Sequence, residues 1–315
     1  MSHQAIEASI PEQTGRRAII TGANSGIGFH AALELARHGA AVVIASRDEA
    51  KGKAAVARIR TEVPAAAAEF SLLDLASLAS VRSFAEREMK RGIALDLLIN
   101  NAGIMAPPKR LETKDGFELQ FGTNVLGHFA LTGLLLPALQ RAASTGAQAP
   151  RIVMIASIAH KRAALNFKDL QFRGSYNPMK SYGQSKLADL MLSFELDRRL
   201  RAKGSSILSV AAHPGVARTN LLQNGDFGAA AKAVRKVAGV AMELFLNSGV
   251  QGARPTLFAA TAAEAQGGGY YGPQGFQEIR GGDVGPARVA AQARDEDAAK
   301  RLWKVCEDLT GVVML

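Results

Sequence analysis

Short apolar runs alternate along the chain with longer segments in which apolar residues recur every three or four positions. Short runs rich in β-branched residues are typical of buried strands, and the longer pattern is typical of helices that pack against a sheet. The runs expected to form strands are residues 16–21, 41–45, 69–73, 94–99, 151–156 and 207–211. The helical patterns between and after them end near residue 38, cover residues 49–62, 77–91 and 115–143, and resume from residue 182.

Strand and helix units that alternate in this way predict an α/β fold with a doubly wound parallel sheet and helices on its faces. Parallel strands present their carboxyl ends at one edge of the sheet, where such folds bind their ligands. The residues that follow each predicted strand are therefore the first candidates for a functional site. With 315 residues, of which 48% are hydrophobic and 21% charged, the chain is long and apolar enough to bury a sizeable core.

Cysteine content and the placement of apolar residues indicate the compartment. The single cysteine, Cys306, excludes an intrachain disulfide and fits a reducing environment. The first fifteen residues lack a basic segment followed by an apolar run, so no secretory signal is expected. The most apolar long window, residues 125–139, is interrupted by polar residues and Pro137 and is too short for a membrane span. We therefore expect a soluble, cytoplasmic protein.

The net charge of +10 raises the question of a nucleic-acid partner. The basic residues are scattered, mostly toward the ends of helical segments, and no aromatic residues are interleaved with them. Solvated helix faces and helix C-termini explain most of them. We expect no nucleic-acid partner, with a polyanionic partner as the alternative, and the dispersed histidines predict no metal site.

A glycine-rich turn follows the first predicted strand. Gly22 ends the run at 16–21, and the sequence Ala-Asn-Ser-Gly-Ile-Gly leads into a helical pattern. Strand, glycine turn and helix form the context of a phosphate-binding loop, in which Gly26 and Gly28 let the backbone approach a pyrophosphate at the helix N-terminus. The alternative is a structural turn of any α/β protein. The candidate cofactor contacts of this turn are Gly22, Asn24, Ser25, Gly26, Ile27 and Gly28.

The end of the second predicted strand indicates which dinucleotide is bound. Arg47 suits a ribose 2′-phosphate through its charged fork, and Ser46 adds a hydroxyl. An acidic residue at the strand end would instead favour NAD. Asp48 lies past that end and is interpreted as the N-cap of the helix at 49–62. The pattern therefore favours NADP (NADPH) over NAD.

The third and fourth predicted strands also end in polar or small residues. Asp74 can accept from an adenine amino group with Leu75 beside it, or it can simply cap the turn. Asn101 and Gly103, in the sequence Asn-Asn-Ala-Gly, leave room for a ligand against the strand ends. These four residues join the candidate cofactor contacts.

A tyrosine and a lysine stand four residues apart near the start of the last long helical pattern. Tyr182 and Lys186 would lie one turn apart on one helix face, where the fixed positive charge favours the phenolate and makes the pair a candidate proton-transfer device. The alternative is a chance surface pair. Tyr176 and Lys180 have the same spacing, but Pro178 between them should keep them off a common helical face.

Asn124 is unusual because it falls inside an apolar helical segment. A buried asparagine is costly unless its hydrogen bonds are satisfied, so a functional role or a helix irregularity is expected there. His160 and His213 follow predicted strands. Each is expected to bond the backbone rather than to act in a pocket.

Six motifs, in order, resemble the short-chain dehydrogenase/reductase family over about residues 15–220. They are TGANSGIG at 21–28, NNAG at 100–103, NVLG at 124–127, Ser157, YGQSK at 182–186 and HPGVART at 213–219. The stretch from 267 to 315 resembles the branch with retinol dehydrogenase-like and protochlorophyllide reductase-like enzymes. Two departures are Ala156, where many members carry a second serine, and a longer segment between Ser157 and Tyr182.

The resemblance implies one NAD(P)-binding, Rossmann-type domain over residues 1–315, with a small helical substrate lid at about 220–247 and a C-terminal extension at about 267–315. It also implies hydride transfer between a nicotinamide and a carbonyl or alcohol carbon, with Tyr182 as general acid and base. Lys186 would assist the phenol and hold the nicotinamide ribose, Ser157 would bond the substrate oxygen, and Asn124 would anchor a water. The nicotinamide end of the cofactor would be covered by Pro214, Gly215 and Thr219.

The character of the segment at 220–247, rich in alanine and bulky apolar residues, favours a lipophilic ketone, aldehyde or secondary alcohol as substrate. A packed pair of surface helices fits the same composition. The helix from Tyr182 is apolar around most of its circumference, so a second subunit or the C-terminal extension should cover it, and we lean to a homo-oligomer. A cofactor-binding regulatory or scaffold protein without turnover is the alternative to an enzyme.

Overall fold

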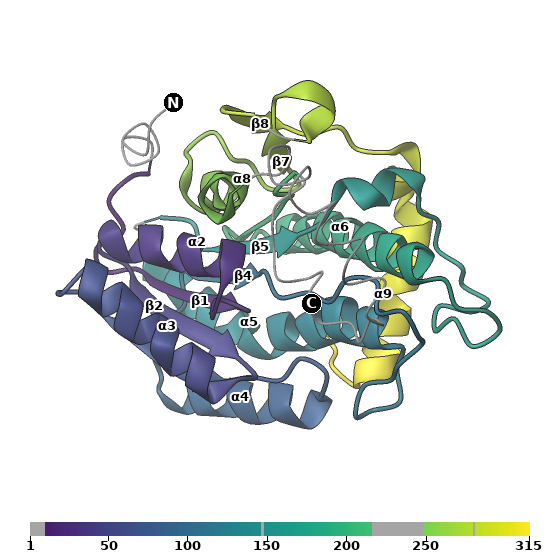
Figure 1. The fold of residues 1–315 in the computed structure, drawn as a ribbon, viewed down its shortest axis with the longest axis horizontal. Coiled ribbons are helices and arrows are strands. Elements are labelled where there is room, and N and C mark those ends of the chain that lie inside the picture. Colours follow the sequence, from purple (N-terminus) through teal and green to yellow (C-terminus); the bar gives the residue numbers. More distant parts are fainter. Residues whose placement is uncertain (1–9, 146–147, 216–247, 280) are drawn as a thin grey trace, which may run out of the picture.

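Eight strands form a single sheet in the order β3-β2-β1-β4-β5-β6-β7-β8 (Figure 1). The computed structural model describes residues 10–145, 148–215, 248–279 and 281–315. The strands are β1 (Arg17–Thr21), β2 (Ala41–Ser46), β3 (Ala68–Leu72), β4 (Leu97–Asn100), β5 (Arg151–Ile155), β6 (Leu208–Ala212), β7 (Tyr270–Pro273) and β8 (Val284–Pro286). All neighbours pair in parallel except β7 and β8, which are antiparallel.

The strand order reverses between β1 and its neighbours, which confirms the predicted doubly wound sheet. β1 pairs with β2 on one side and with β4 on the other, so the chain winds outward in both directions from this strand. The carboxyl ends of β1 and β4 therefore flank a crevice. Six strands lie where the sequence predicts them, although β4 begins at Leu97, three residues later than expected.

The last two strands, β7 and β8, were not predicted from sequence. β7 has four residues and β8 has three, and both contain glycine and proline. Such short segments show no periodicity, and proline is tolerated only at sheet edges or strand ends. The C-terminal extension thus adds two strands to the sheet before it ends in a helix.

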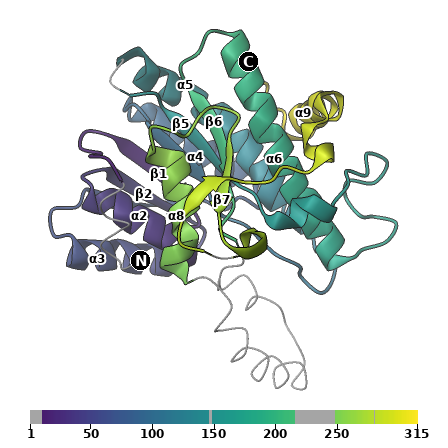
Figure 2. The same ribbon diagram turned by 90° about the horizontal axis from the view of Figure 1, so that it is seen from above.

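Alternating side chains of the strands feed two apolar cores, one on each face of the sheet. On β1, Ile19 packs with one core, whereas Ala18 and Ile20 pack with the other. The first core lies under α4 (Leu78–Lys90), α5 (Gly127–Thr145), α6 (Pro178–Ala202) and α9 (Glu296–Thr310). The second lies under α2 (Gly26–Arg37), α3 (Glu49–Glu62) and α8 (Gly249–Thr261), and Figure 2 shows the two helical layers from above.

A π-helical segment, η1 (Phe121–Leu126), precedes α5 and contains Asn124. The helix irregularity expected at this asparagine is therefore present. Together the two segments form a continuous helical run, Phe121–Thr145, of 25 residues, in which an 18-residue window has a mean hydropathy of 1.2. The run is long and apolar enough to cross a membrane, so the expectation that it is too short was wrong. Of this window 83% is buried inside the protein, where it fills the first core.

The helix that carries Tyr182 begins where its sequence dictates. Asn177 caps α6 by accepting a hydrogen bond from the Lys180 amide, and Pro178 occupies the first helical position, where a missing N–H costs nothing. Tyr176 therefore lies outside the helix and shares no helical face with Lys180. The prediction that this second tyrosine and lysine do not form a helical pair is confirmed.

The apolar outer face of α6 is covered by α9 from the C-terminal extension. Leu302, Trp303 and Cys306 of α9 are buried in the core that α6 shares, and the Arg199 guanidinium lies 4.4 Å from the centre of the Trp303 ring. Of the two covers considered for this face, the C-terminal extension is therefore the one present. A homo-oligomer stays a prediction. The predicted lid at 220–247 and Thr219 lie outside the described residues.

Candidate active site

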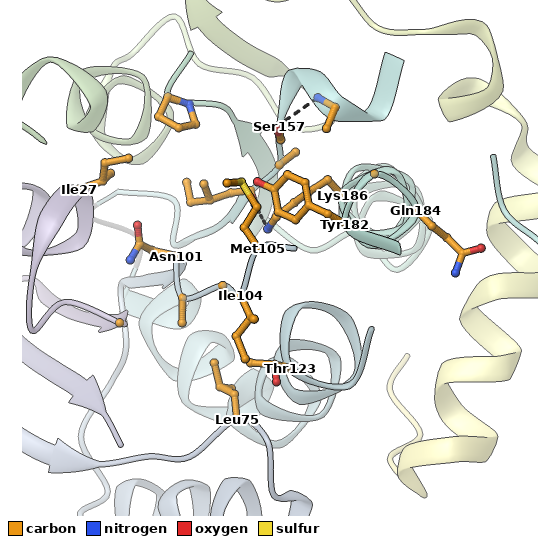
Figure 3. A pocket seen from close by; sticks show the side chains of 18 of the residues that line it. Ile27, Leu75, Asn101, Ile104, Met105, Thr123, Ser157, Tyr182, Gln184 and Lys186 are labelled. Carbon is orange, nitrogen blue, oxygen red and sulfur yellow. Dashed lines mark hydrogen bonds between the residues drawn. The ribbon is translucent and has the colours of Figure 1, made fainter. Parts of the chain in front are cut away.

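A cleft of about 1740 Å³ opens at the carboxyl ends of the strands. Ligand pockets for small molecules usually measure about 300 to 1,000 Å³, so this cleft can hold a dinucleotide together with a substrate. Figure 3 shows that Tyr182 points into it from α6, with Ile104 and Met105 close by and Ser157 at the end of β5. Every predicted cofactor residue that the structure describes lines this cleft.

The glycine turn is built for close approach between two strand ends. Gly22 has a φ of +67°, and a Cβ there would lie 2.9 Å from the Ala102 Cα. A Cβ on Gly28 would collide with the Asn101 side chain. Gly26 has a φ of +59° with open space where its Cβ would point. Gly22 and Gly28 therefore let this turn pack against the Asn-Asn-Ala-Gly segment, while Gly26 leaves backbone exposed to the cleft.

The N-terminus of α2 has the features of an anion site. Ser25 is the N-cap residue, yet its side chain makes no capping hydrogen bond, and the first turn of the helix contains no acidic residue. The first backbone N–H groups of a helix lack intrahelical acceptors and carry a partial positive charge. These groups fit the pyrophosphate of a dinucleotide lying in the cleft.

A buried network joins the glycine turn to the Asn-Asn-Ala-Gly segment. The Thr21 hydroxyl accepts hydrogen bonds from the amides of Asn101 and Ala102, both at 2.9 Å. Its own hydrogen is then directed to His128 Nε2, also at 2.9 Å, so the ring donates from Nδ1 to the Asn124 carbonyl at 2.8 Å. Burial lowers the pKa of His128 to about 3, which keeps this histidine neutral. Thr21 begins the TGANSGIG motif but received no role from the sequence, and no pattern indicated His128.

The strand end expected to read the ribose carries an exposed arginine and a helix cap. Asp48 accepts from the Lys51 amide at 3.0 Å, which confirms it as the N-cap of α3. Arg47 and Ser46 line the cleft beside it. No acidic side chain in the described part of the chain pairs with Arg47, so its guanidinium can take an anionic group of a ligand.

Asp74 caps its own turn and also lines the cleft. One of its carboxylate oxygens accepts from the Ala76 amide at 3.1 Å, and the other lies 3.1 Å from Lys114 Nζ. The capping alternative considered for this residue is therefore present. Leu75 lies beside it on the cleft wall.

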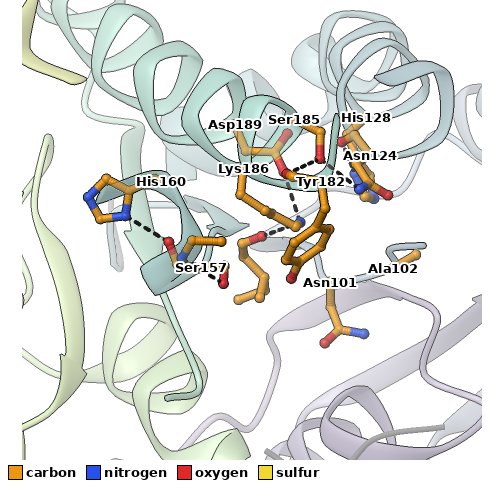
Figure 4. A network of polar contacts seen from close by, with 12 residues as sticks. Asn101, Ala102, Asn124, His128, Ser157, His160, Tyr182, Ser185, Lys186 and Asp189 are labelled. Atoms are coloured by element: carbon orange, nitrogen blue, oxygen red, sulfur yellow. Dashed lines mark hydrogen bonds and ion pairs between the residues drawn. The ribbon is translucent and has the colours of Figure 1, made fainter. Parts of the chain in front are cut away.

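The tyrosine, the lysine and the serine meet at one end of the cleft (Figure 4). Tyr182 and Lys186 are only 9% and 5% exposed. The Lys186 ammonium donates to the Ile155 carbonyl at 2.8 Å and to Asp189 at 2.9 Å. Ser157 caps the short helix η2 (Ile158–Arg162), and its oxygen accepts from the Ala159 amide at 3.2 Å. That leaves the serine hydrogen available to a ligand.

Asn124 lies behind the cleft wall rather than on it. Its side-chain oxygen accepts from the Ile104 amide at 2.8 Å, and its nitrogen donates to the Ile104 carbonyl and to Ser185 Oγ, both at 3.0 Å. The residue thus joins the segment after β4 to α6. These bonds satisfy the buried amide, and the water expected to be held by Asn124 stays a prediction.

Both strand-end histidines lie outside the cleft lining and bond the backbone, as expected. His160 Nδ1 lies 2.7 Å from the Ser157 carbonyl, and His213 Nδ1 accepts from the Gly215 amide at 3.2 Å. His213 also approaches Glu278, with 3.5 Å between Nε2 and Oε2. Burial lowers the pKa of both histidines. No group of acidic, histidine or cysteine residues that could hold a metal ion occurs among the described residues.

The family model for short chain dehydrogenases matches residues 16–226. The chain belongs to the short-chain dehydrogenase family. Members of this family bind a nicotinamide cofactor and are oxidoreductases. The fold, the glycine turn at the crevice and the tyrosine and lysine on α6 agree with that membership.

The similarity to known proteins extends over nearly the whole of this chain. It is 42% identical to a mouse polyprenol dehydrogenase over 96% of this chain and 86% of that protein, and 40% identical to human retinol dehydrogenase 13 over 97% and 87%. A crystal structure of an uncharacterized protein from Mycobacterium paratuberculosis is 40% identical, covers 98% of both chains and has a TM-score of 0.78. The resemblance to the retinol dehydrogenase branch is therefore confirmed.

The substrate end of the cleft in this short-chain dehydrogenase was not predicted in detail. Most of its apolar lining residues lie outside the regular helices and strands, namely Ile104, Met105, Ala164, Phe172 and Ile279, whereas Met179 lies in the first turn of α6. The one sequence signal for them was an apolar residue close to a predicted strand end or to Tyr182, such as Met105 or Met179. These side chains form an apolar part of the cleft wall, and charged residues such as Lys161, Arg162 and Arg288 line the same cleft.

Proposed function

We propose that this short-chain dehydrogenase is NADP-dependent and transfers a hydride between the nicotinamide and a lipophilic ketone, aldehyde or alcohol. The observation that carries the proposal is the meeting of Ser157, Tyr182 and Lys186 in the same cleft as the glycine turn. Each of these side chains comes from a different strand end or helix turn. A scaffold protein would not need this juxtaposition.

The residues of the cleft fit a dinucleotide. The open N-terminus of α2 suits its pyrophosphate, and the exposed Arg47 with Ser46 suits a 2′-phosphate. Pro214 and Gly215 also line the cleft and would cover the nicotinamide end. When bound, the nicotinamide supplies or accepts the hydride.

The chain's own residues handle the proton and the substrate oxygen. During reduction of a carbonyl, the Tyr182 hydroxyl gives its proton to the substrate oxygen, and during oxidation the phenolate removes it. The Ser157 hydroxyl donates a hydrogen bond to the same oxygen, where negative charge develops. The buried Lys186 ammonium favours the phenolate and can hold the nicotinamide ribose.

The apolar wall formed by Ile104, Met105 and Phe172 supports a lipophilic substrate. The names of the two relatives, a polyprenol dehydrogenase and a retinol dehydrogenase, refer to isoprenoid alcohols. An isoprenoid aldehyde or alcohol is therefore the first substrate class to test. Burial of its chain against this wall would contribute about 25 cal/mol per Å² of apolar surface.

The test is a turnover assay with NADPH and with NADH. Geranial, an isoprenoid aldehyde, is offered beside a panel of aliphatic and aromatic ketones, and loss of nicotinamide absorbance is followed. Reduction of geranial with NADPH, faster than with NADH, is expected. Binding of NADPH without turnover of any carbonyl compound would instead support a regulatory or scaffold protein.

A further inference from the structure

Asp189 is a buried carboxylate that the proposed reaction does not use. It lies on α6 one turn after Lys186 and is completely buried. Its Oδ2 atom is 2.9 Å from the Lys186 ammonium, while Oδ1 has no hydrogen-bond partner among the described residues (Figure 4). A buried carboxylate with an unsatisfied oxygen is costly and calls for an explanation.

The contacts of Lys186 show what Asp189 does to it. An ammonium has three N–H groups. Two of them are directed to Asp189 and to the Ile155 carbonyl, so one is left for the cleft. Asp189 thereby fixes the rotamer of the lysine and the direction from which its charge acts on Tyr182.

The negative charge of Asp189 also matters, because its carboxylate lies 2.9 Å from the Lys186 ammonium. A carboxylate beside the ammonium cancels part of the positive field that favours the phenolate. The proposed function assigns that field to Lys186. A chain with a neutral residue at this position would present the full ammonium charge to Tyr182.

We propose that Asp189 is a positioning residue that holds the Lys186 ammonium and offsets part of its charge, and so sets the pH range in which Tyr182 exchanges its proton. The inference rests on the proposed function as far as turnover is concerned. The arrangement of the three side chains on one helix face is independent of any substrate.

The other titratable groups that face the Lys186 and Asp189 pair are buried and neutral. Cys306 of α9 packs nearby, and burial, followed by the charges of Asp189 and Glu307, raises the pKa of its thiol. His128 of α5 is buried and neutral. Tyr182 is the titratable group of the cleft that lies one helical turn before Lys186.

The protonation behaviour of the pair agrees with this geometry. Burial raises the pKa of Asp189 to about 6, although Lys186 opposes the rise. Burial opposes the charge on Lys186, yet Asp189 and Tyr182 together raise its pKa. The carboxylate is therefore charged, and its offset present, from neutral pH upward, where a phenol titrates.

The experiment compares the wild type with Asp189→Asn, which keeps the shape and removes the charge. Ultraviolet difference spectroscopy follows tyrosine ionisation in the cofactor-free protein, and subtraction of matched Tyr182→Phe variants isolates one of the four tyrosines. The Tyr182 signal is expected to titrate at lower pH in Asp189→Asn. The acidic limb of the pH profile for geraniol oxidation with NADP should move the same way, by about one pH unit.

Asp197→Asn is the matched control. Asp197 is a second buried aspartate of α6 and pairs with Arg201 at 2.7 Å, two turns away from Asp189. The same substitution there should leave both titrations at the wild-type pH. Asp189→Glu retains the charge and should restore a profile close to that of the wild type.

The outcomes separate the inference from the proposed function. A wild type that turns over no substrate would refute the function, while the spectroscopic titration would still decide the role of Asp189. Unshifted tyrosine ionisation in folded Asp189→Asn would overturn the inference. If this variant does not fold, Asp189→Ser takes its place, and failure of both to fold beside a folded Asp189→Glu would assign Asp189 a purely structural role.

Discussion

The Nε2 atom of His128 lies 2.9 Å from the Thr21 hydroxyl, a contact between residues 107 positions apart in the chain. Thr21 ends β1, and its side-chain oxygen accepts hydrogen bonds from the amides of Asn101 and Ala102. His128 in turn donates a hydrogen bond to the Asn124 carbonyl. One neutral imidazole thus links the glycine turn, the segment after β4 and the irregular helix. This network sets the walls between which a cofactor would lie.

Removing the Thr21 hydroxyl should loosen this junction. Thr21→Val keeps the shape but leaves the Ala102 amide and one imidazole nitrogen without a partner, which costs about 1 to 3 kcal/mol per buried group, while the Asn101 amide keeps the Ile99 carbonyl. We expect a lower free energy of unfolding and at least about tenfold weaker NADPH binding, measured by denaturant titration and by NADPH fluorescence. Thr61→Val, at an exposed helix position, is the control and should change neither.

The two tyrosines near the start of α6 should differ sharply. Tyr182→Phe removes the proton donor and should abolish NADPH-dependent carbonyl reduction, by about 100-fold or more in kcat. Tyr176 donates to the Pro107 carbonyl at 3.0 Å, and burial raises its pKa to about 12. Tyr176→Phe should therefore retain most activity. The reverse result in a steady-state assay would mean that the wrong tyrosine has been assigned.

Arg47 should decide between the two dinucleotides. Because it is exposed and unpaired among the described residues, Arg47→Ala should not affect folding. Loss of a charge-assisted bond to a 2′-phosphate costs about 1.5 to 3 kcal/mol, so KM for NADPH should rise by about tenfold to a hundredfold. KM for NADH should stay nearly constant. Equal effects on both cofactors would contradict the assignment of Arg47 to the 2′-phosphate.

Glu278 should contribute a pH-dependent part of the stability. Its carboxylate lies 2.7 Å from Lys161 Nζ and accepts from the Arg288 amide at 2.8 Å. Burial opposes its charge, but His213, Lys161 and the Arg288 amide together lower its pKa to about 2. A lowered pKa stabilises the folded state above the ordinary carboxyl value and loses this effect as pH falls toward 2.

The variant Glu278→Gln tests that contribution. At neutral pH it should be less stable than the wild type by about 1 to 3 kcal/mol, measured by urea titration. The difference should shrink steadily below about pH 4, where this carboxyl becomes protonated in the unfolded chain, and should vanish toward pH 2, where it becomes protonated in the folded protein. A difference that does not change with pH would show that the charge of Glu278 is not what stabilises this region.

Features encoded by neighbouring residues could be predicted from the sequence. The glycine turn, the N-cap at Asp48, the start of α6 at Pro178 and the spacing of Tyr182 and Lys186 each depend on a few adjacent positions. Six of the seven strands that pair in parallel were recognisable from their apolar runs for the same reason.

What could not be predicted depends on contacts between distant segments. Nothing next to Thr21 in the sequence indicates a histidine 107 positions later, and β7 and β8 are too short to show a period. The spacing of Lys186 and Asp189 is local, but the burial that makes their pair important comes from α9 and α5. The remaining contacts of the site therefore depend on tertiary packing, which the local sequence pattern does not show.

The start of α6 at Asn177 and Pro178 separates the loop before it from the tyrosine that follows. A residue added within α6 before Tyr182 would rotate the phenol by about 100° around the helix axis. A residue added between η2 and Asn177 would leave the phenol in place, because the capped proline restarts the helix at a fixed point. This loop, which supplies Ala164 and Phe172 to the cleft wall, can therefore change in length and shape a different substrate space around an unaltered acid.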